Sequence, residues 1–356
     1  MPQTHVRLTT KGLLMLCLLL CLLLCLLLWL PGCQRAKDVD YLWQDYSQRL
    51  AHVIDQPYSP PEFKPMQLGK ADRQEQASLT ISILDTLSLG HCPLGRLIAD
   101  HNSTLGKVAP PSQQLIYQIR FIQLAPACID TLDEGELKTK LTHALEQKQA
   151  DAMAYFNRVL TRDKSITKSL FIGYDSLVLD EMRASRFELE SAIGQLLSIK
   201  GHIKQRQWQQ IDTAQIEPAL ALMAHQTLLH RYLRSLAYSQ AQLIALNDYL
   251  QLHSASVACR PNHASRKQEI LQNVFQKYYL AQTQAYLSQL NQLHYRLSEP
   301  IIALFAGSSH QAFIEHYFGE QPGALPEQLK SQMRRHVKWW QAFRESCNIA
   351  PPSSST

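Results

Sequence analysis

A serine–lysine pair is the first feature of the sequence with potential chemistry. Ser165-Ile166-Thr167-Lys168 matches the SxxK pattern that carries the nucleophile in penicillin-binding enzymes. The companion SDN and KTG patterns do not occur in the sequence, and Gly307-Ser308-Ser309 lacks the second glycine of a nucleophile elbow. The sequence therefore predicts no catalytic residue at either place.

The histidines do not have the spacing of metal ligands. There are 14, without an HExxH pattern. His225 and His230 are five residues apart, and His310 and His316 are six apart, whereas neighbours on one helix face are three or four apart. Paired CxxC ligands are also missing. We expect solvated or core histidines, with no metal and no cofactor.

The N-terminus resembles a bacterial lipoprotein signal. A basic start with Arg7 and Lys11 precedes residues 13–30, which carry no charge and are mostly leucine. The following tetrapeptide, Leu30-Pro31-Gly32-Cys33, is similar to the lipobox, in which an aliphatic residue, a small residue and a lipid-bearing cysteine recur. We predict cleavage before Cys33 and lipidation of its thiol; the alternative is an uncleaved signal anchor with an incidental cysteine.

Lipid on Cys33 would hold the chain stably on a membrane, because two or more acyl chains suffice for anchoring. Gln34 follows Cys33, whereas Asp at that place retains enteric lipoproteins in the inner membrane. We therefore expect the outer membrane, facing the periplasm, with the periplasmic face of the inner membrane as the alternative.

Four cysteines remain beyond the leader and Cys33: Cys92, Cys128, Cys259 and Cys347. An even number in an oxidising compartment favours two disulfides. Three pairings are open, and we prefer Cys92–Cys128 with Cys259–Cys347 because each bridge then stays within one half of the chain. The three leader cysteines lie in the segment that is predicted to be removed.

The most distinctive segment after the leader is 91–118, which combines a cysteine, two glycines and a Pro-Pro turn. Arg96, Asn102 and Lys107 could form a polar surface that binds an anion or a partner. The structural alternative is a capped helix–turn–helix held by a disulfide, in which each of these residues has a turn or cap role; this is the preferred interpretation.

Helical spacing of apolar residues dominates the rest of the chain, and alternating strand patterns are scarce. The fold class is therefore predicted to be all-α, a multi-helix bundle or stacked helical hairpins. The expected helices cover residues 38–55, 71–89, 93–102, 113–125, 132–161, 177–199, 216–252, 266–305, 312–318 and 326–346. Residues 166–174 are ambiguous, Pro300 is expected to kink or break its helix, and the aromatic residues of the last helix are expected to face inward.

The predicted organisation is a signal peptide (1–32), a segment with the lipid-bearing cysteine, a first helix and a Pro-rich connector (33–70), a helical periplasmic body (71–349) with a soft boundary near 162–175, and a disordered tail (350–356). The formal net charge is +5, and Lys and Arg form no long run. This pattern argues against nucleic acid as a partner.

The body resembles the family labelled domain of unknown function 3080. The resemblance rests on CPLGRLIADHNSTLGKV at 92–108, on Cys128, on RFELESAIGQL at 186–196 and on Cys259. It implies a shared helical body and shared cysteines over nearly the whole mature chain, and it implies no activity and no functional residues.

Three functions are carried forward. The first is a non-enzymatic helical module of the cell envelope that binds another envelope protein. The second is a periplasmic enzyme acting on cell-wall or lipid material. The third is a carrier of a lipid or small ligand in a cavity between helices.

Overall fold

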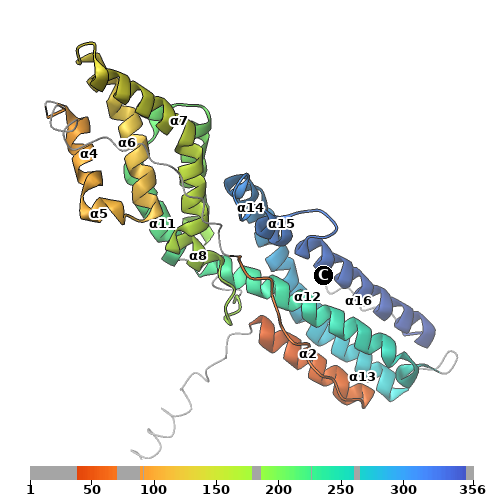
Figure 1. Cartoon of the computed structure of the whole chain (residues 1–356). Coiled ribbons are helices and arrows are strands. Elements are labelled where there is room, and N and C mark those ends of the chain that lie inside the picture. The colour runs from red at the N-terminus through yellow and green to blue at the C-terminus, as the bar shows by residue number, and fades with distance from the viewer. Residues whose placement is uncertain are drawn as a thin grey trace, which may run out of the picture. The chain divides into compact units, whose positions relative to one another are not determined.

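The computed structural model describes residues 38–69, 89–90, 92–178, 186–225, 227–259 and 265–349. These ranges contain helices and no strand, which confirms the all-α fold class. Contacts divide the chain into Met1–Lys37, which lies outside these ranges, and Asp38–Thr356, whose helices are shown in Figure 1.

The α-helices are α2 (Val39–Ile54), α4 (Pro93–Asn102), α5 (Thr104–Lys107), α6 (Pro111–Asp130), α7 (Glu136–Arg162), α8 (Lys164–Leu170), α10 (Arg186–Lys204), α11 (Ile216–His225), α12 (Leu228–Leu252), α13 (Arg266–Val274), α14 (Ala285–Phe305), α15 (Gln311–Phe318) and α16 (Leu325–Cys347). Three short turns, η1 (Trp208–Gln210), η2 (Thr213–Gln215) and η3 (Ser254–Val257), are 3-10 helices, and η4 (Phe275–Gln284) is a π-helix.

α12 lies at the centre of the main hydrophobic cluster. It packs against α16, α2 and α8, and Figure 1 shows α2 and α16 on either side of it. Most of its apolar residues are buried, including Leu229, Tyr232, Leu233, Leu243 and Leu246. A helix at the protein surface has one apolar face toward the core and one polar face toward water. The burial around α12 therefore indicates that it is covered from several sides.

Three buried polar residues of α12 each bind a different segment. Ser239 accepts a hydrogen bond from Trp43 of α2. Gln242 accepts one from Tyr58, which lies in the Pro-rich segment after α2. Asn247 donates to the carbonyl oxygen of Gln332 on α16. Because a buried polar group without a partner is costly, these bonds fix which neighbour lies against each turn of α12.

A second, smaller hydrophobic cluster joins α4, α6 and α7. Leu94, Ile98, Phe121 and Leu141 are buried in it. The Cys92–Cys128 disulfide ties the start of α4 to the last turns of α6. The predicted soft boundary near 162–175 is not tested and stays a prediction; Ile166, Leu170 and Ile172 of that stretch are buried in the main cluster.

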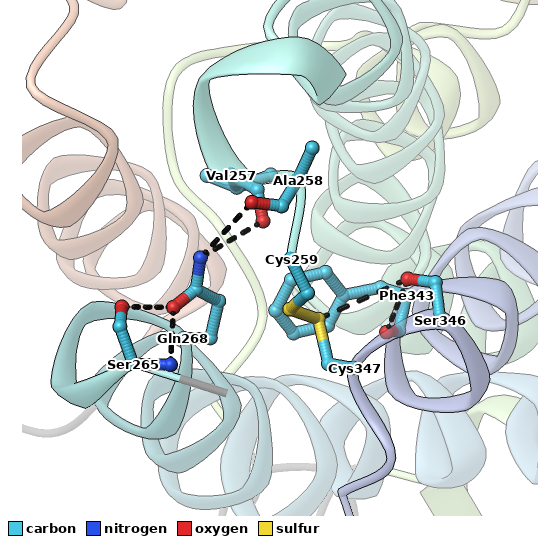
Figure 2. Close-up of a disulfide and its surroundings, with 8 residues drawn as sticks. All are labelled: Val257, Ala258, Cys259, Ser265, Gln268, Phe343, Ser346 and Cys347. Atoms are coloured by element: carbon cyan, nitrogen blue, oxygen red, sulfur yellow. Dashed lines mark hydrogen bonds between the residues drawn. A yellow bond between two sulfur atoms is a disulfide. The ribbon is translucent and has the colours of Figure 1, made fainter. Parts of the chain in front are cut away.

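Both expected disulfides are present, with the preferred pairing. Cys259 bonds Cys347 at the end of α16, and the two Cα atoms are 5.2 Å apart. Figure 2 shows this bridge beside Gln268, whose amide donates to the carbonyl oxygens of Val257 and Ala258. Ser265 and Gln268 also form the capping box that begins α13. The bridge and these bonds hold the 254–259 segment against α13 and α16.

Two prolines lie inside helices that were expected to stop or bend there. The helix predicted for 113–125 continues through Pro126 to Asp130 as α6, because Cys128 in its last turns is tied to α4. α14 likewise passes Pro300 and runs to Phe305. Its end is held by the Lys200 ammonium, which donates to the carbonyl oxygens of Ala303, Leu304 and Ala306. Tertiary contacts of this kind outweigh the roughly 3 kcal/mol that an interior proline costs a helix.

Other predicted helices do not run as far as expected, because tertiary contacts interrupt them. The single helix expected over 216–252 is two helices, because α11 packs on α8 and α10 whereas α12 packs on α16 and α2. Leu177 is extended rather than helical: its N–H donates to Ser235 and its carbonyl oxygen accepts from Tyr286. Phe187, in the first turn of α10, is 77% exposed.

Several predictions fall outside the described residues. They are the leader and Cys33, nearly all of the helix expected at 71–89, and the tail at 350–356.

His336 of α16 is a core histidine whose bonds are all satisfied. It is fully buried, its Nε2 accepts from Tyr46 (2.8 Å) and Trp340 (3.1 Å), and its Nδ1 donates to Asn247 Oδ1 (2.8 Å). Two donors at Nε2 leave the proton of the neutral ring on Nδ1. Burial lowers the pKa of His336 to about 3. This imidazole ties α2, α12 and α16 together.

We predict that acid destabilises the protein through this ring. The unfolded chain protonates His336 below about pH 6.5, whereas the folded chain resists protonation to about pH 3, so stability is complete above pH 6.5 and is lost as pH falls. His336→Gln should lower stability at pH 7 and flatten the slope between pH 4 and 6 by about 1.4 kcal/mol per pH unit. Urea unfolding at several pH values measures this, and an unchanged slope would contradict it.

Candidate functional site

A largely apolar pocket of about 320 Å³ lies between α12, α14 and α16. Its walls include Leu236 of α12, Leu287 and Leu290 of α14, and Leu329 and Met333 of α16. A few polar side chains complete the lining: Gln284, Ser288, Asn291, His294, Tyr295 and Lys330. An apolar cavity with a small number of placed polar groups is the usual form of a small-molecule site. We call it the His294 pocket.

His294 is the polar centre of the pocket. Its side chain is only 1% exposed, and its Nδ1 lies 2.8 Å from the Tyr232 hydroxyl. Among the described residues, none hydrogen-bonds to its Nε2. A buried polar atom without a partner is uncommon in folded proteins, and one that lies in the wall of a pocket is a candidate ligand contact.

The Tyr232 hydroxyl determines which nitrogen carries the proton. Its only hydrogen bond within the described ranges is to Nδ1, and that bond satisfies either the hydroxyl hydrogen or a hydrogen on Nδ1; we infer that the hydroxyl donates. The remaining proton of the neutral imidazole then sits on Nε2. This N–H is buried and belongs to a residue that lines the pocket.

The imidazole stays neutral at physiological pH. Burial, and then the nearby Lys330 charge, lower the pKa of His294 to about 4, while Glu327 acts weakly in the other direction. The Phe318 ring stacks on both side chains: its centroid lies 5.4 Å from that of Tyr232 and 6.4 Å from that of His294. This packing holds the ring in place as an uncharged donor.

A hydrogen-bond acceptor comes from the π-helix η4. Gln284, the last residue of η4, contributes Oε1, which is buried and has no hydrogen-bond partner in the part of the chain that the structure describes. A π-helix displaces side chains relative to an α-helix and often occurs at functional sites. Here it brings an amide to the pocket wall.

Lys330, which lines the pocket, belongs to a charge pair. Lys330 donates to Glu327 (2.6 Å) and to the Tyr295 hydroxyl (3.3 Å), and Tyr295 is 58% exposed. Burial alone would lower the pKa of Lys330, but its bonds to Glu327 and Tyr295 raise it. The ammonium therefore stays charged.

A polar groove of about 420 Å³ is lined by other residues of α16 and α12. Gln240 and Gln328 in its lining hydrogen-bond to each other, and Ser331 is exposed in it. The groove thus offers a natural position for control substitutions on the same helix.

The residues predicted as a binding surface lie elsewhere. Arg96 is exposed on α4, Asn102 is the half-buried last residue of that helix, and Lys107 ends α5 with a side chain outside the described part of the structure. The structure does not bring them to the His294 pocket, and a binding role for them stays a prediction. Ser165 and Lys168 lie on α8. Trp340 and Phe343 are buried, so the expected inward packing of the last helix is confirmed for both.

Sequence reasoning missed His294 because its signal is weak. The residue belongs to an apolar stripe of α14 that includes Leu287, Leu290 and Leu297. A histidine in such a stripe looks like any core histidine. What distinguishes it is the contact with Tyr232, 62 residues earlier, and this contact is set by tertiary packing.

Metal chemistry finds no support in the described ranges, where no group of three or more His, Cys, Asp or Glu side chains could hold an ion. Of the helices that the structure describes, none has both the length and the apolar character needed to cross a bilayer.

Comparison with known proteins places the chain in a family. Residues 43–351 match the family described as "Protein of unknown function (DUF3080)". The match covers most of the chain, so the protein belongs to this family, as the sequence resemblance implied. No curated protein and no solved structure matches the chain.

We predict that the Tyr232–His294 pair adds little to stability. Tyr232→Phe with His294→Leu removes both partners of one hydrogen bond together with an unpaired buried nitrogen. Replacement of both partners by apolar groups of similar shape is nearly neutral, so the free energy of unfolding should stay within about 1 kcal/mol of wild type.

The matched control is Tyr46→Phe with His336→Leu. That pair of changes leaves Trp340 Nε1 and Asn247 Oδ1 without His336 and should cost about 3 kcal/mol or more. Urea unfolding measures both variants. Equal losses would mean that His294 is a packing residue like His336.

Proposed function

We propose that this protein is a lipid-anchored, non-enzymatic binding protein of the cell envelope that holds a small amphipathic molecule in the His294 pocket. The sequence favoured a module for protein–protein interaction, with a ligand carrier as an alternative. The His294 pocket favours the ligand carrier over the interaction module. The observation that carries it is the unpaired Nε2 of a buried, neutral imidazole in an apolar wall.

The lining indicates the chemistry of the ligand. Leucine and methionine side chains favour an apolar body, because transfer of such surface from water is favourable by about 25 cal/mol per Å². The Nε2–H donor requires an acceptor oxygen on the ligand, such as a carboxylate or an ester carbonyl. The Lys330 ammonium also lines the pocket, where its charge is paired with Glu327. A fatty-acyl molecule combines these features.

The same bonds argue against catalysis by His294. A catalytic base of this type is oriented by a carboxylate that stabilises the imidazolium when it gains a proton. Here the orienting group is a tyrosine hydroxyl, and burial disfavours the charged ring. The arrangement suits a fixed hydrogen-bond donor better than a proton acceptor.

The proposed cellular location rests on the N-terminus and the cysteines. The basic start, the leucine-rich run and Leu30-Pro31-Gly32-Cys33 support lipidation of Cys33 after cleavage. The two disulfides support an oxidising compartment such as the periplasm. Gln34 favours the outer membrane over the inner one. Interaction with another envelope protein remains an expectation from the sequence.

The pocket predicts binding of a fluorescent fatty acid. A dansyl-labelled medium-chain fatty acid should brighten on addition of the protein. His294→Leu should weaken its affinity about tenfold, which corresponds to the loss of one hydrogen bond of about 1.4 kcal/mol. Asn291→Trp, which fills the pocket and leaves His294 in the sequence, should weaken it further. Ser331→Trp in the polar groove is the control and should bind as wild type does. Equal affinity for all four proteins would rule out the His294 pocket.

The proposed lipid anchor predicts how Cys33→Ser changes cleavage of the leader. Wild-type protein should yield an N-terminal peptide that begins at Cys33 and carries acyl chains, detected by mass spectrometry. The Ser variant should keep its leader, because no thiol is available for the lipid. Normal cleavage and membrane retention of Cys33→Ser would instead show that lipid on this residue does not hold the protein.

A further inference from the structure

Aromatic and apolar side chains are exposed on α2, in the segment that follows it and in the loop after α8. Tyr174 is 95% exposed, Phe171 60%, Met66 43% and Tyr41 39%. We call these four residues the tether-side patch. Isolated exposed apolar residues are ordinary, so the question is whether the fold brings these four to one place.

Hydrogen bonds join the segments that carry the patch. Ser176, two residues after Tyr174, donates to Asp40, the neighbour of Tyr41. Gln67, next to Met66, donates to the carbonyl oxygen of Ile172, next to Phe171. Figure 1 shows the loop after α8 beside the beginning of α2. These bonds bring together the three segments that carry the four residues.

The base of the patch is buried and fixed. Arg234 of α12, with 8% of its side chain exposed, donates to both Asp40 and Ser176 at 2.7 Å. Ser235 accepts from the Leu177 N–H, and the Tyr286 hydroxyl donates to the Leu177 carbonyl oxygen. A loop held by this many bonds cannot fold its aromatic side chains back into the core, so their exposure is a built feature.

The patch lies at one end of the α2–α12 pair. Asp40 in the first turn of α2 contacts Arg234, and Gln56 just after α2 accepts a hydrogen bond from Tyr249 near the end of α12. The two helices therefore run in the same direction, away from the patch. Leu252, which is 76% exposed, lies about 27 Å from Arg234 along the axis of α12.

The chain that precedes the patch is short. Residues 34–38 separate Cys33 from Val39, the first residue of α2. Even a fully extended segment of this length spans only about 20 Å. If Cys33 sits at a membrane surface, the first turn of α2 is confined to a thin layer next to the headgroups.

We propose that the tether-side patch inserts into the headgroup region of the phospholipid bilayer that holds Cys33. This rests on the anchor in the proposed function. Tyrosine and phenylalanine side chains favour the interface, where an apolar ring and a polar tip are both satisfied. The tether removes most of the translational cost of binding, so a few inserted side chains suffice. The exposed Lys164 and Lys168 of α8 and the basic Arg35 and Lys37 of the tether favour anionic headgroups, while the exposed Asp175 opposes them.

The test uses the full-length mature protein, purified from membranes and reconstituted into vesicles of phosphatidylethanolamine and phosphatidylglycerol. An environment-sensitive NBD label is attached at Tyr174→Cys and, as the matched control, at Leu252→Cys. Both positions are exposed, so neither change disturbs the core. The label at 174 should shift to shorter wavelength, brighten several-fold and be quenched by lipids with brominated acyl chains. The label at 252 should behave as it does in water.

Two outcomes overturn the inference. A label at 174 that matches the label at 252 in water places the patch off the membrane and leaves it for a protein partner. A shift at both positions means that membrane contact is not confined to the patch. Mass spectrometry of the N-terminal peptide from the same preparation separates the two proposals, because a Cys33 without acyl chains refutes the anchor itself.

Discussion

The burial of α12 is the constraint on which the rest of the structure depends. The helix is covered by α2, α8 and α16, and its buried polar residues must find partners on those neighbours. Arg234 binds Asp40 at the start of α2, Ser239 binds Trp43, and Asn247 binds Gln332 and His336. These bonds place α2 parallel to α12 and α16 beside it. They also fix the positions of Leu236, which lines the pocket, and of Tyr232, which hydrogen-bonds to His294.

His336 and His294 are both buried on this framework, and they differ in the number of their hydrogen-bond partners. His336 has bonds at both ring nitrogens and joins three helices. His294 has one bond, and its second nitrogen lies in a pocket wall. Burial lowers the pKa of both rings, so charge does not distinguish them. What distinguishes them is a ring nitrogen of His294 that has no hydrogen-bond partner among the described residues.

The sequence predicted the fold class, most helices and both disulfides, because these depend on local spacing and on cysteine number. α4 begins at Pro93, where a proline at the first helical position is favourable. Helix ends that depend on distant partners were not predictable: α6 continues past Pro126 toward the Cys128 bridge, and Leu177 is held extended by Ser235 and Tyr286. The pocket was missed for the same reason. Its polar atoms come from η4, α14 and α16, and only packing brings them together.

The central claim is that His294 is a neutral imidazole with its proton on Nε2. Nitrogen-15 NMR of the histidine-labelled protein measures this state directly, and the His294→Leu variant assigns the signal. The account predicts one nitrogen pair with the shifts of the Nε2–H tautomer that persists as the pH falls to about 4. Titration near the ordinary value of about 6.5, or a proton on Nδ1, would contradict the account.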